Sequence, residues 1–230
     1  MSGMAAVLMV LAIAALVLVA VGFWRTRKHT KKSKCCSSSS KCSKCGCSAS
    51  AFDFRTDIFA ELEAVTGGGG SGMTGMSDSG FLTVLSTNIK TCGKTNTLFC
   101  DVSAESAILL IESDSNATGT TIVSSTSGEA ATLEMQVLVD GLPIAPGTIT
   151  FDSLTHAVTT NLLPGDAKTE LVNLAEANAF TFIAPGISAG THTVLVQARL
   201  TAAASATAEL LSFASAVLAS RTLTVTPACV

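Results

Sequence analysis

The sequence is poor in the side chains from which catalytic sites are assembled. Its 230 residues include no tyrosine, one tryptophan and three histidines, and 13% of them are charged. Acid–base and phosphate sites need clustered titratable groups, so this composition argues against an enzyme. Proline is scarce as well, at five residues, whereas 48% of the residues are hydrophobic. Such a chain is too apolar to be disordered and must have a membrane segment or a large core.

Charge is distributed unevenly along the chain. Eight of the 14 Lys and Arg residues lie between Arg25 and Lys44, where no acidic residue occurs. The rest of the chain has 6 basic and 17 acidic residues. A basic arm is therefore attached to an acidic body.

An apolar segment precedes the basic arm. Met4 to Trp24 comprises 21 residues without a charge, about 31 Å as a helix, which matches the hydrocarbon core of a bilayer. A cleaved signal peptide would need a basic start and small residues at the cleavage site, whereas Phe23, Trp24 and Arg25 stand there. Residues 1–24 are therefore predicted to be an uncleaved transmembrane anchor, and the basic flank places the body on the cytosolic side.

Residues 25–50 are predicted to be a basic, cysteine-rich tether. Five of the eight cysteines lie between Cys35 and Cys47 among Ser, Lys and Gly. Together with Cys35 or Cys36, the thiolates of Cys42, Cys45 and Cys47 could bind zinc, but a second Cys-x-x-Cys pair at the usual distance is missing. S-acylation, disulfides in an oxidising assembly and free thiols are the other interpretations. We expect no metal and no cofactor.

Residues 51–66 are predicted to be a short amphipathic helix. Ser50 and Asp53 resemble a capping box, and apolar residues then recur at helical spacing. Acidic residues on the polar side disfavour a membrane surface, so we expect the apolar stripe to bind a partner protein through Phe54, Ile58, Phe59, Leu62 and Val65. The glycines from Gly67 onward end this helix, and residues 67–80 are predicted to be a flexible spacer.

Residues 81–230 are predicted to form an all-β domain, a single β-sandwich of the jelly-roll or Ig-like type. Runs rich in Thr, Val, Ile and Leu alternate with turn signals such as Asp140-Gly141 and Pro164-Gly165. On propensity, the alanine-rich residues 201–218 could be strand or helix. Strands are predicted near residues 81–88, 97–102, 106–112, 119–125, 131–139, 147–152, 155–160, 169–174, 179–184, 191–200, 206–213 and 221–226.

Three motifs in the body point to no chemistry. Cys92 to Thr95 resembles the end of a phosphate-binding loop, but the glycine expected five residues before Gly93 is missing. His156 and His192 lie in strand-like, Thr-rich surroundings without a metal-ligand or catalytic pattern. Asn116-Ala117-Thr118 is a glycosylation sequon that can be used only in a lumenal domain. We expect neither a small-molecule substrate nor a nucleic-acid partner.

One stretch of the body carries a resemblance. The run from Phe180 to Val194, followed by Val196 to Arg199, resembles the paired late strands of jelly-roll and immunoglobulin-like domains in virion and surface proteins. The whole chain resembles membrane-anchored minor capsid proteins of large icosahedral DNA viruses. This resemblance implies a structural protein at the virion inner membrane and capsid interior, with the lipid bilayer and other capsid proteins as partners. The alternative is a membrane-anchored cell-surface adhesion or ligand-binding module, which requires the opposite topology.

Overall fold

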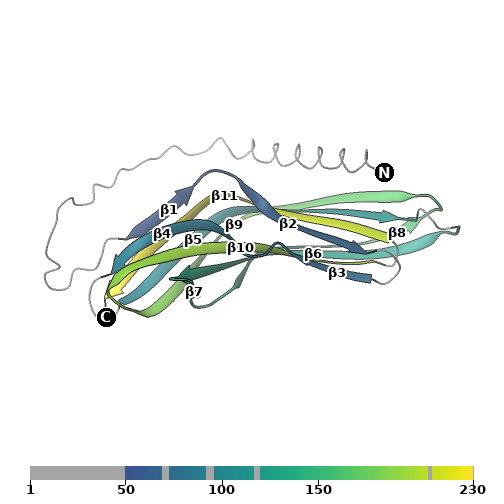
Figure 1. Ribbon diagram of the computed structural model, residues 1–230. Helices are drawn as coiled ribbons and strands as arrows, with labels where there is room; N and C mark the ends of the chain where they lie inside the picture. The colour runs from purple at the N-terminus through teal and green to yellow at the C-terminus, as the bar shows by residue number, and fades with distance from the viewer. Residues whose placement is uncertain (1–49, 69–72, 92–95, 117–119, 207–208, 230) are drawn as a thin grey trace. The chain divides into compact units, whose positions relative to one another are not determined.

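The computed structural model describes residues 50–68, 73–91, 96–116, 120–206 and 209–229. Within these ranges the protein is all-β, with eleven strands and no helix (Figure 1). None of the described elements is an apolar helix that could cross a membrane. The predicted anchor and all of the tether except Ser50 lie outside the described residues.

The first sheet, called sheet A, has four strand positions. One edge is built from two short strands, β1 (Ala51–Arg55) and β2 (Phe59–Gly68), which pair with successive parts of β11 (Glu209–Cys229). Then come β5 (Asn96–Ser115) and, at the other edge, β9 (Ala167–Ile187). All of these pairings are antiparallel.

The second sheet, called sheet B, repeats this plan. Its first edge consists of β3 (Met73–Asp78) and β4 (Leu82–Thr91), which pair with successive parts of β10 (Gly190–Ala206). Beside β10 lies β6 (Val123–Val139), which pairs with β8 (Ile149–Leu162) and with the short β7 (Leu142–Pro143). The chain therefore crosses between the two sheets several times. Each of the described strands pairs only with strands of its own sheet.

The core lies between the two sheets. On β10, alternate residues point inward, and Val194, Val196 and Ala198 are fully buried. On β5, the even-numbered residues point inward, from Leu98 and Cys100 to Ile108 and Leu110. Side chains from both sheets thus form one apolar cluster, as in other two-layer β folds.

The strands are longer than the sequence predicted. Residues 97–102 and 106–112 belong to a single strand, β5, and the predicted pairs of strands within β6, β8, β9 and β11 are likewise continuous. The predicted break at residues 103–105 is absent because β5 pairs with β9 there, and the next residue, Ser106, points into the sandwich, where it donates to Asp152 Oδ2 at 2.8 Å. The described part of residues 201–218 is strand, as the end of β10 and the start of β11.

The prediction of a helix over residues 51–66 was wrong. These residues form β1 and β2. Their apolar residues have helical spacing, but pairing with β11 makes the segment extended. The predicted spacer over residues 67–80 is corrected as well, because Gly67 and Gly68 end β2 and residues 73–78 form β3. The sandwich therefore begins near residue 51, about thirty residues earlier than predicted.

Candidate functional site

The five predicted partner-binding residues do not share one face. Phe54 and Ile58 are on the surface, with exposed fractions of 54% and 52%. Phe59 is half-buried against the core, and Leu62 is fully buried within it. Val65 lies in β2, opposite Phe213 of β11. A period of two, not of 3.6, therefore decides which of these side chains can reach a partner.

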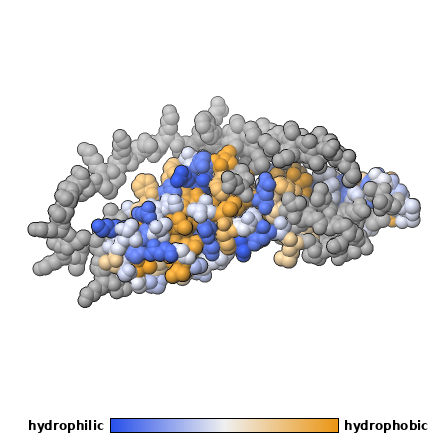
Figure 2. Space-filling view, viewed as in Figure 1, coloured by the Kyte–Doolittle hydropathy of each residue, from blue (hydrophilic) through white to orange (hydrophobic). Residues whose placement is uncertain are grey.

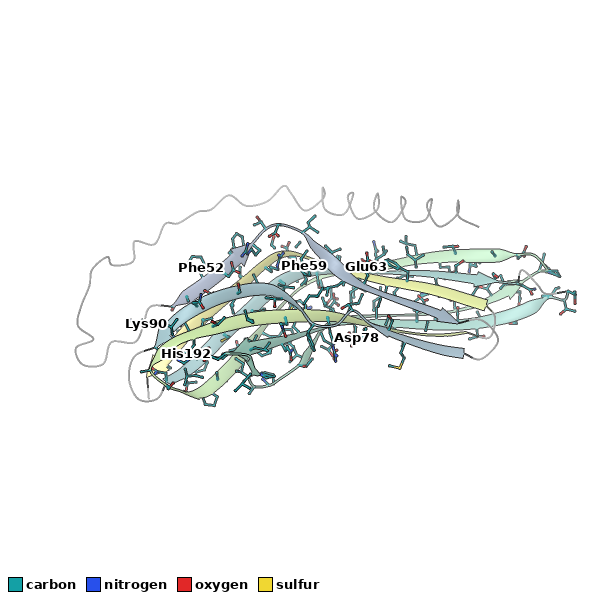
Figure 3. The ribbon with its side chains drawn as sticks, in the orientation of Figure 1. Phe52, Phe59, Glu63, Asp78, Lys90 and His192 are labelled. Atoms are coloured by element: carbon teal, nitrogen blue, oxygen red, sulfur yellow. The ribbon has the colours of Figure 1, made fainter. Side chains whose placement is uncertain are left out.

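The exposed members belong to an apolar patch at the edge of sheet A. Phe52, Phe54 and Ile58 make up this β1 patch, and Phe52 is the most exposed of them, at 74%. Figure 3 shows Phe52 on β1 and Phe59 at the start of β2. The sequence Phe-Asp-Phe carries the signal for this arrangement, because in a strand the two rings share one side. Phe52 was missed because the segment was interpreted as a helix.

Asp53, which lies between Phe52 and Phe54 in sequence, holds β1 against sheet B. Its Oδ2 accepts a hydrogen bond of 3.0 Å from the Ser86 backbone N–H of β4. The neighbouring Arg55 forms an ion pair of 3.2 Å with the same carboxylate. The backbone that presents Phe52 and Phe54 is therefore fixed to both layers of the sandwich.

The turn between β1 and β2 is held by a buried arginine. Arg221 of β11 is 3% exposed, and its Nη1 donates to Asp57 O at 2.7 Å. Its Nε donates to Val84 O of β4 at 3.0 Å, and its guanidinium carbon lies 5.6 Å from the centroid of the Phe59 ring. Ile58 is thus part of an ordered turn.

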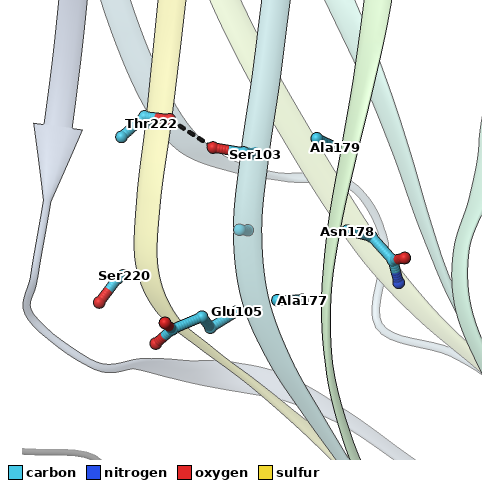
Figure 4. A pocket seen from close by; sticks show the side chains of 8 residues that line it. Ser103, Glu105, Ala177, Asn178, Ala179, Ser220 and Thr222 are labelled. Atoms are coloured by element: carbon cyan, nitrogen blue, oxygen red, sulfur yellow. Dashed lines mark hydrogen bonds between the residues drawn. The ribbon is translucent and has the colours of Figure 1, made fainter. Parts of the chain in front are cut away.

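A shallow depression lies on the same outer side of sheet A. Register places Phe54 of β1 beside Thr222, Thr222 beside Ser103, and Ser103 beside Ala179. Ser103 and Thr222 form a hydroxyl–hydroxyl hydrogen bond of 2.6 Å, drawn as the dashed line in Figure 4. The depression has a volume of about 330 Å³ and is lined mainly by small side chains: Ser103, Ala104, Glu105, Ala177, Asn178, Ala179, Ser220 and Thr222.

Apolar residues on the surface alternate with hydrophilic patches. Figure 2 shows several apolar areas on the visible face of the domain, separated by charged and polar side chains. Other exposed apolar side chains include Met76 of β3 and Leu142 of β7. The β1 patch differs from these because its members are neighbours in one strand and the turn that follows it.

The two histidines of the body each contact a carboxylate. His156 Nε2 lies 2.7 Å from Glu170 Oε2, and His192 Nδ1 lies 2.7 Å from Asp140 Oδ2. Among the described residues, no group of three or more His, Cys, Asp or Glu side chains is arranged to hold a metal ion. The thiolates proposed for zinc, Cys42, Cys45 and Cys47, lie outside the described residues.

Cys100 is a free thiol inside the core. Its side chain is fully buried, and burial followed by the nearby charge of Asp101 raises its pKa to about 12. A thiol held in its protonated form is a poor nucleophile and a poor metal ligand. Cys100 is therefore a packing residue.

Asn116, the acceptor of the sequon, is buried. Its side-chain nitrogen donates to Thr121 O at 3.0 Å and to Leu162 O at 3.2 Å. A glycan on this nitrogen would leave it one N–H, so at least one of the two hydrogen bonds would be lost, and the glycan needs space that the buried side chain does not have. The sequon is therefore a poor reporter of topology.

Comparisons with known proteins give weak matches. No protein-family model and no curated protein matches the chain. The structure of infectious bursal disease virus, Gx strain, is similar over 79% of this chain and 42% of that chain, with 10% identity and a TM-score of 0.19. The chain thus spans less than half the length of that neighbour.

Two further solved structures are similar at the same level. VP1 of Trichodysplasia spinulosa-associated polyomavirus, in complex with 3'-sialyllactose, matches over 79% of this chain and 97% of that chain, with 8% identity and a TM-score of 0.22. TmCBM61, in complex with beta-1,4-galactotriose, matches over 74% and 86%, with 8% identity and a TM-score of 0.14. At such TM-scores these likenesses carry no argument about function.

Proposed function

We propose that the chain is a non-enzymatic structural protein that ties a membrane to a protein assembly, in the manner of a minor capsid protein. In this proposal the apolar segment before Arg25 anchors the chain in the bilayer, with the body on the cytosolic side, and in a virion it lies between the inner membrane and the capsid. The β-sandwich then docks on a neighbouring protein.

The observation that carries this proposal is the β1 patch. Phe52, Phe54 and Ile58 expose more than half of their surface each, on the first strand after the tether and in the turn that follows it. Clustered, exposed aromatic side chains on a rigid strand are typical anchors of protein–protein interfaces. Their position immediately after the tether is the place where a membrane-anchored domain would meet a layer of protein close to the membrane.

The strand order supports the fold part of the proposal. Four positions in sheet A, ordered β1/β2, β11, β5 and β9, face four in sheet B, ordered β3/β4, β10, β6 and β8. This is the order of an eight-position jelly roll, an architecture of viral capsid and lectin domains among others. Because one fold serves many functions, the strand order makes a capsid role compatible without establishing it.

The membrane part is tested on the full chain. We expect the protein to remain in the membrane fraction after alkaline extraction, and protease added outside sealed microsomes to digest the body, because the cytosolic face is outward. Release by alkali would refute the anchor, and protection of the body would favour the adhesion alternative.

The docking part is tested with the double variant Phe52→Ser, Phe54→Ser in the full chain. We expect the neighbour cross-linked to the wild-type chain in the native assembly to be lost, because two apolar anchors are removed. The matched control is Leu142→Ser, which removes an equally exposed apolar side chain from β7 in the other sheet. An unchanged cross-linked product in the double variant would rule out the β1 patch as the contact.

A second candidate function, ligand binding, is favoured by the depression in Figure 4. Its hydroxyl groups and the Glu105 carboxylate could bind a small polar ligand such as a saccharide. Ala179→Trp would fill this depression. Abolished glycan binding by the variant, together with measurable binding by the wild-type chain, would establish the module function in place of docking.

A further inference from the structure

The inner face of β5 changes character along the strand. From Leu98 to Leu110 it contributes apolar residues such as Val102 and Ile108 to the core. Near the end of the strand, Glu112 and Asp114 point into the sandwich, and each is only 3% exposed. Among the described residues, neither oxygen of Glu112 and only one oxygen of Asp114 has a hydrogen-bond partner. Two carboxyl groups are therefore buried side by side with most of their acceptor oxygens unsatisfied.

The hydroxyl of Ser127 does not satisfy both carboxyl groups. Ser127 Oγ, from β6 in the opposite sheet, donates to Asp114 Oδ2 at 3.2 Å. It also lies near Glu112 and favours the ionised form of that carboxyl group. A serine has one hydroxyl proton to donate. Whichever carboxylate receives this proton, the other is left without it.

The positive charges near this end are engaged elsewhere. In sheet A, Glu112 pairs with Glu170 and Asp114 pairs with Lys168 in register. The Lys168 ammonium forms an ion pair with Glu170, and His156 of β8 binds the same carboxylate at 2.7 Å. Glu170 thus receives both cationic partners, and its negative charge faces Glu112 from the neighbouring strand.

The strands around Glu112 contribute mostly acidic and small apolar side chains to its surroundings. From β5, β6, β8 and β9 the titratable and charged side chains are Asp114, Glu129, Asp152, His156, Lys168 and Glu170. On β11 and β10 the described inward residues nearest this level are Ala214, Ala216, Ala202 and Ala204. Acidic groups outnumber basic ones inside this end of the sandwich.

We propose that Glu112 holds a proton in the folded domain over a pH range in which an exposed glutamate is ionised, and that this proton keeps the distal end of the sandwich closed. The distal end comprises residues 108–115 of β5, 123–131 of β6, 154–162 of β8 and 167–174 of β9, which register places at one end of the strands in Figure 1. An ionised, unpartnered carboxylate in this position is costly. The neutral acid removes the charge and gains a donor.

Burial has the largest effect on the pKa of Glu112 and raises it. The hydrogen bond of Ser127 and the charge of His156 lower this pKa, the charges of Asp114 and Glu170 raise it, and the net shift is upward. A raised pKa in the folded state means that the contribution of Glu112 to stability is complete below the ordinary glutamate range. That contribution is lost as the pH rises through the folded-state pKa. Acidity therefore closes this end, and a rise in pH loosens it.

The test compares the full-length wild-type chain with Glu112→Gln, in which a neutral amide replaces the carboxyl group. The unfolding equilibrium constant of each is measured in urea from about pH 4 to about pH 8. One proton released on unfolding changes this constant by up to about tenfold per pH unit. We expect the wild-type to variant ratio to rise with pH at up to that slope and then to level off. Glu105→Gln, on the outer side of the same strand, should show a flat ratio.

Other outcomes would overturn the proposal. A ratio that is flat over the whole range would mean that Glu112 is ionised in the folded chain. Stabilisation of the wild-type chain but not of Glu112→Gln by calcium or magnesium chloride at neutral pH would mean that a cation, not a proton, neutralises this end. Should the variant fail to fold, the carboxyl carbon of Glu112 can be titrated by NMR in the unaltered chain. A midpoint in the ordinary glutamate range would then refute the proposal.

Discussion

Arg221 of β11 holds the turn between β1 and β2 by donating from Nη1 to the backbone oxygen of Asp57 at 2.7 Å, although 164 residues separate the two in sequence. The arginine is buried, whereas Asp57 is exposed, and the ion pair between their side chains is long, at 3.4 Å. The hydrogen bonds to main-chain carbonyls, not the ion pair, are therefore the main contribution of Arg221.

Arg221→Met should destabilise the domain by about 3–5 kcal/mol. The apolar stem is kept, but Val84 O and Leu218 O lose a donor in buried places, and Asp57 O and Ala219 O lose one in partly buried places. Urea denaturation measures the loss. Asp57→Asn, which removes the exposed carboxylate charge and keeps the backbone oxygen, should change stability by less than about 1 kcal/mol. Equal losses in the two variants would show that the ion pair matters more than the carbonyls.

Leu62→Asp and Ile58→Asp should have opposite outcomes, although helical spacing assigned both residues to one stripe. Leu62 is fully buried, so Leu62→Asp removes its packing and buries a charge, at a cost above about 4 kcal/mol. Ile58 is half exposed in the turn, so Ile58→Asp should leave the melting temperature within a few degrees of the wild type. Thermal unfolding followed by circular dichroism distinguishes the two. A melting temperature in Leu62→Asp close to that of the wild type would contradict the placement of β2 in the core.

A fragment of residues 79–230 should be much less stable than one of residues 50–230. The shorter fragment lacks β1, β2 and β3, which form one edge of sheet A and part of one edge of sheet B. It also loses the buried Leu62 and Ala64 and the packing of Phe59. Together these losses amount to about 4–6 kcal/mol. Melting temperatures of the two fragments measure the effect, and equal values would mean that the first three strands are accessory.

The sequence predicted the fold class because alternation is a local signal. Val194, Val196 and Ala198 alternate with Thr193 and Leu195, and in the structure the first three are fully buried. Turn chemistry was equally legible at Asp140-Gly141, where both residues have positive φ. Strand length was not predictable from local pattern. Ser106 and Glu112 are polar residues that point into the interior of the sandwich, and the groups around them, such as Asp152 and Ser127, are remote in sequence.

The candidate site was predictable only in part, for a related reason. Phe54 and Ile58 were identified as partner-binding residues, and both are exposed. The error over Leu62 arose because Phe54, Ile58 and Leu62 are spaced by four, which suits a helix and also suits alternate positions in a strand. Pairing with β11, more than a hundred residues away, decides between helix and strand. This pairing cannot be recognised from the sequence of one short segment.

The His192–Asp140 pair should make the end of β10 sensitive to pH. The hydrogen bond that the His192 ring donates to Asp140 raises the pKa of His192 against a smaller effect of burial, and the same contact lowers the pKa of Asp140. The stability contributed by His192 is complete below the ordinary histidine range and is lost as the pH rises through its raised pKa, whereas that of Asp140 is lost as the pH falls through its lowered pKa. The pair therefore stabilises the domain most between these two limits.

Asp140→Asn separates this charge effect from the turn geometry. Asparagine tolerates the positive φ of 52° at this position and keeps an acceptor for the Thr193 N–H, which now donates to Asp140 Oδ1 at 2.9 Å. We expect the pKa of His192 to fall in the variant, because burial then acts without the carboxylate, and the fold to be retained. NMR titration of the His192 ring protons measures the change, with the His156 resonances as an internal reference. If the titration midpoint of His192 were the same in both proteins, its contact with Ser188 O at 3.0 Å, rather than Asp140, would be the source of the shift.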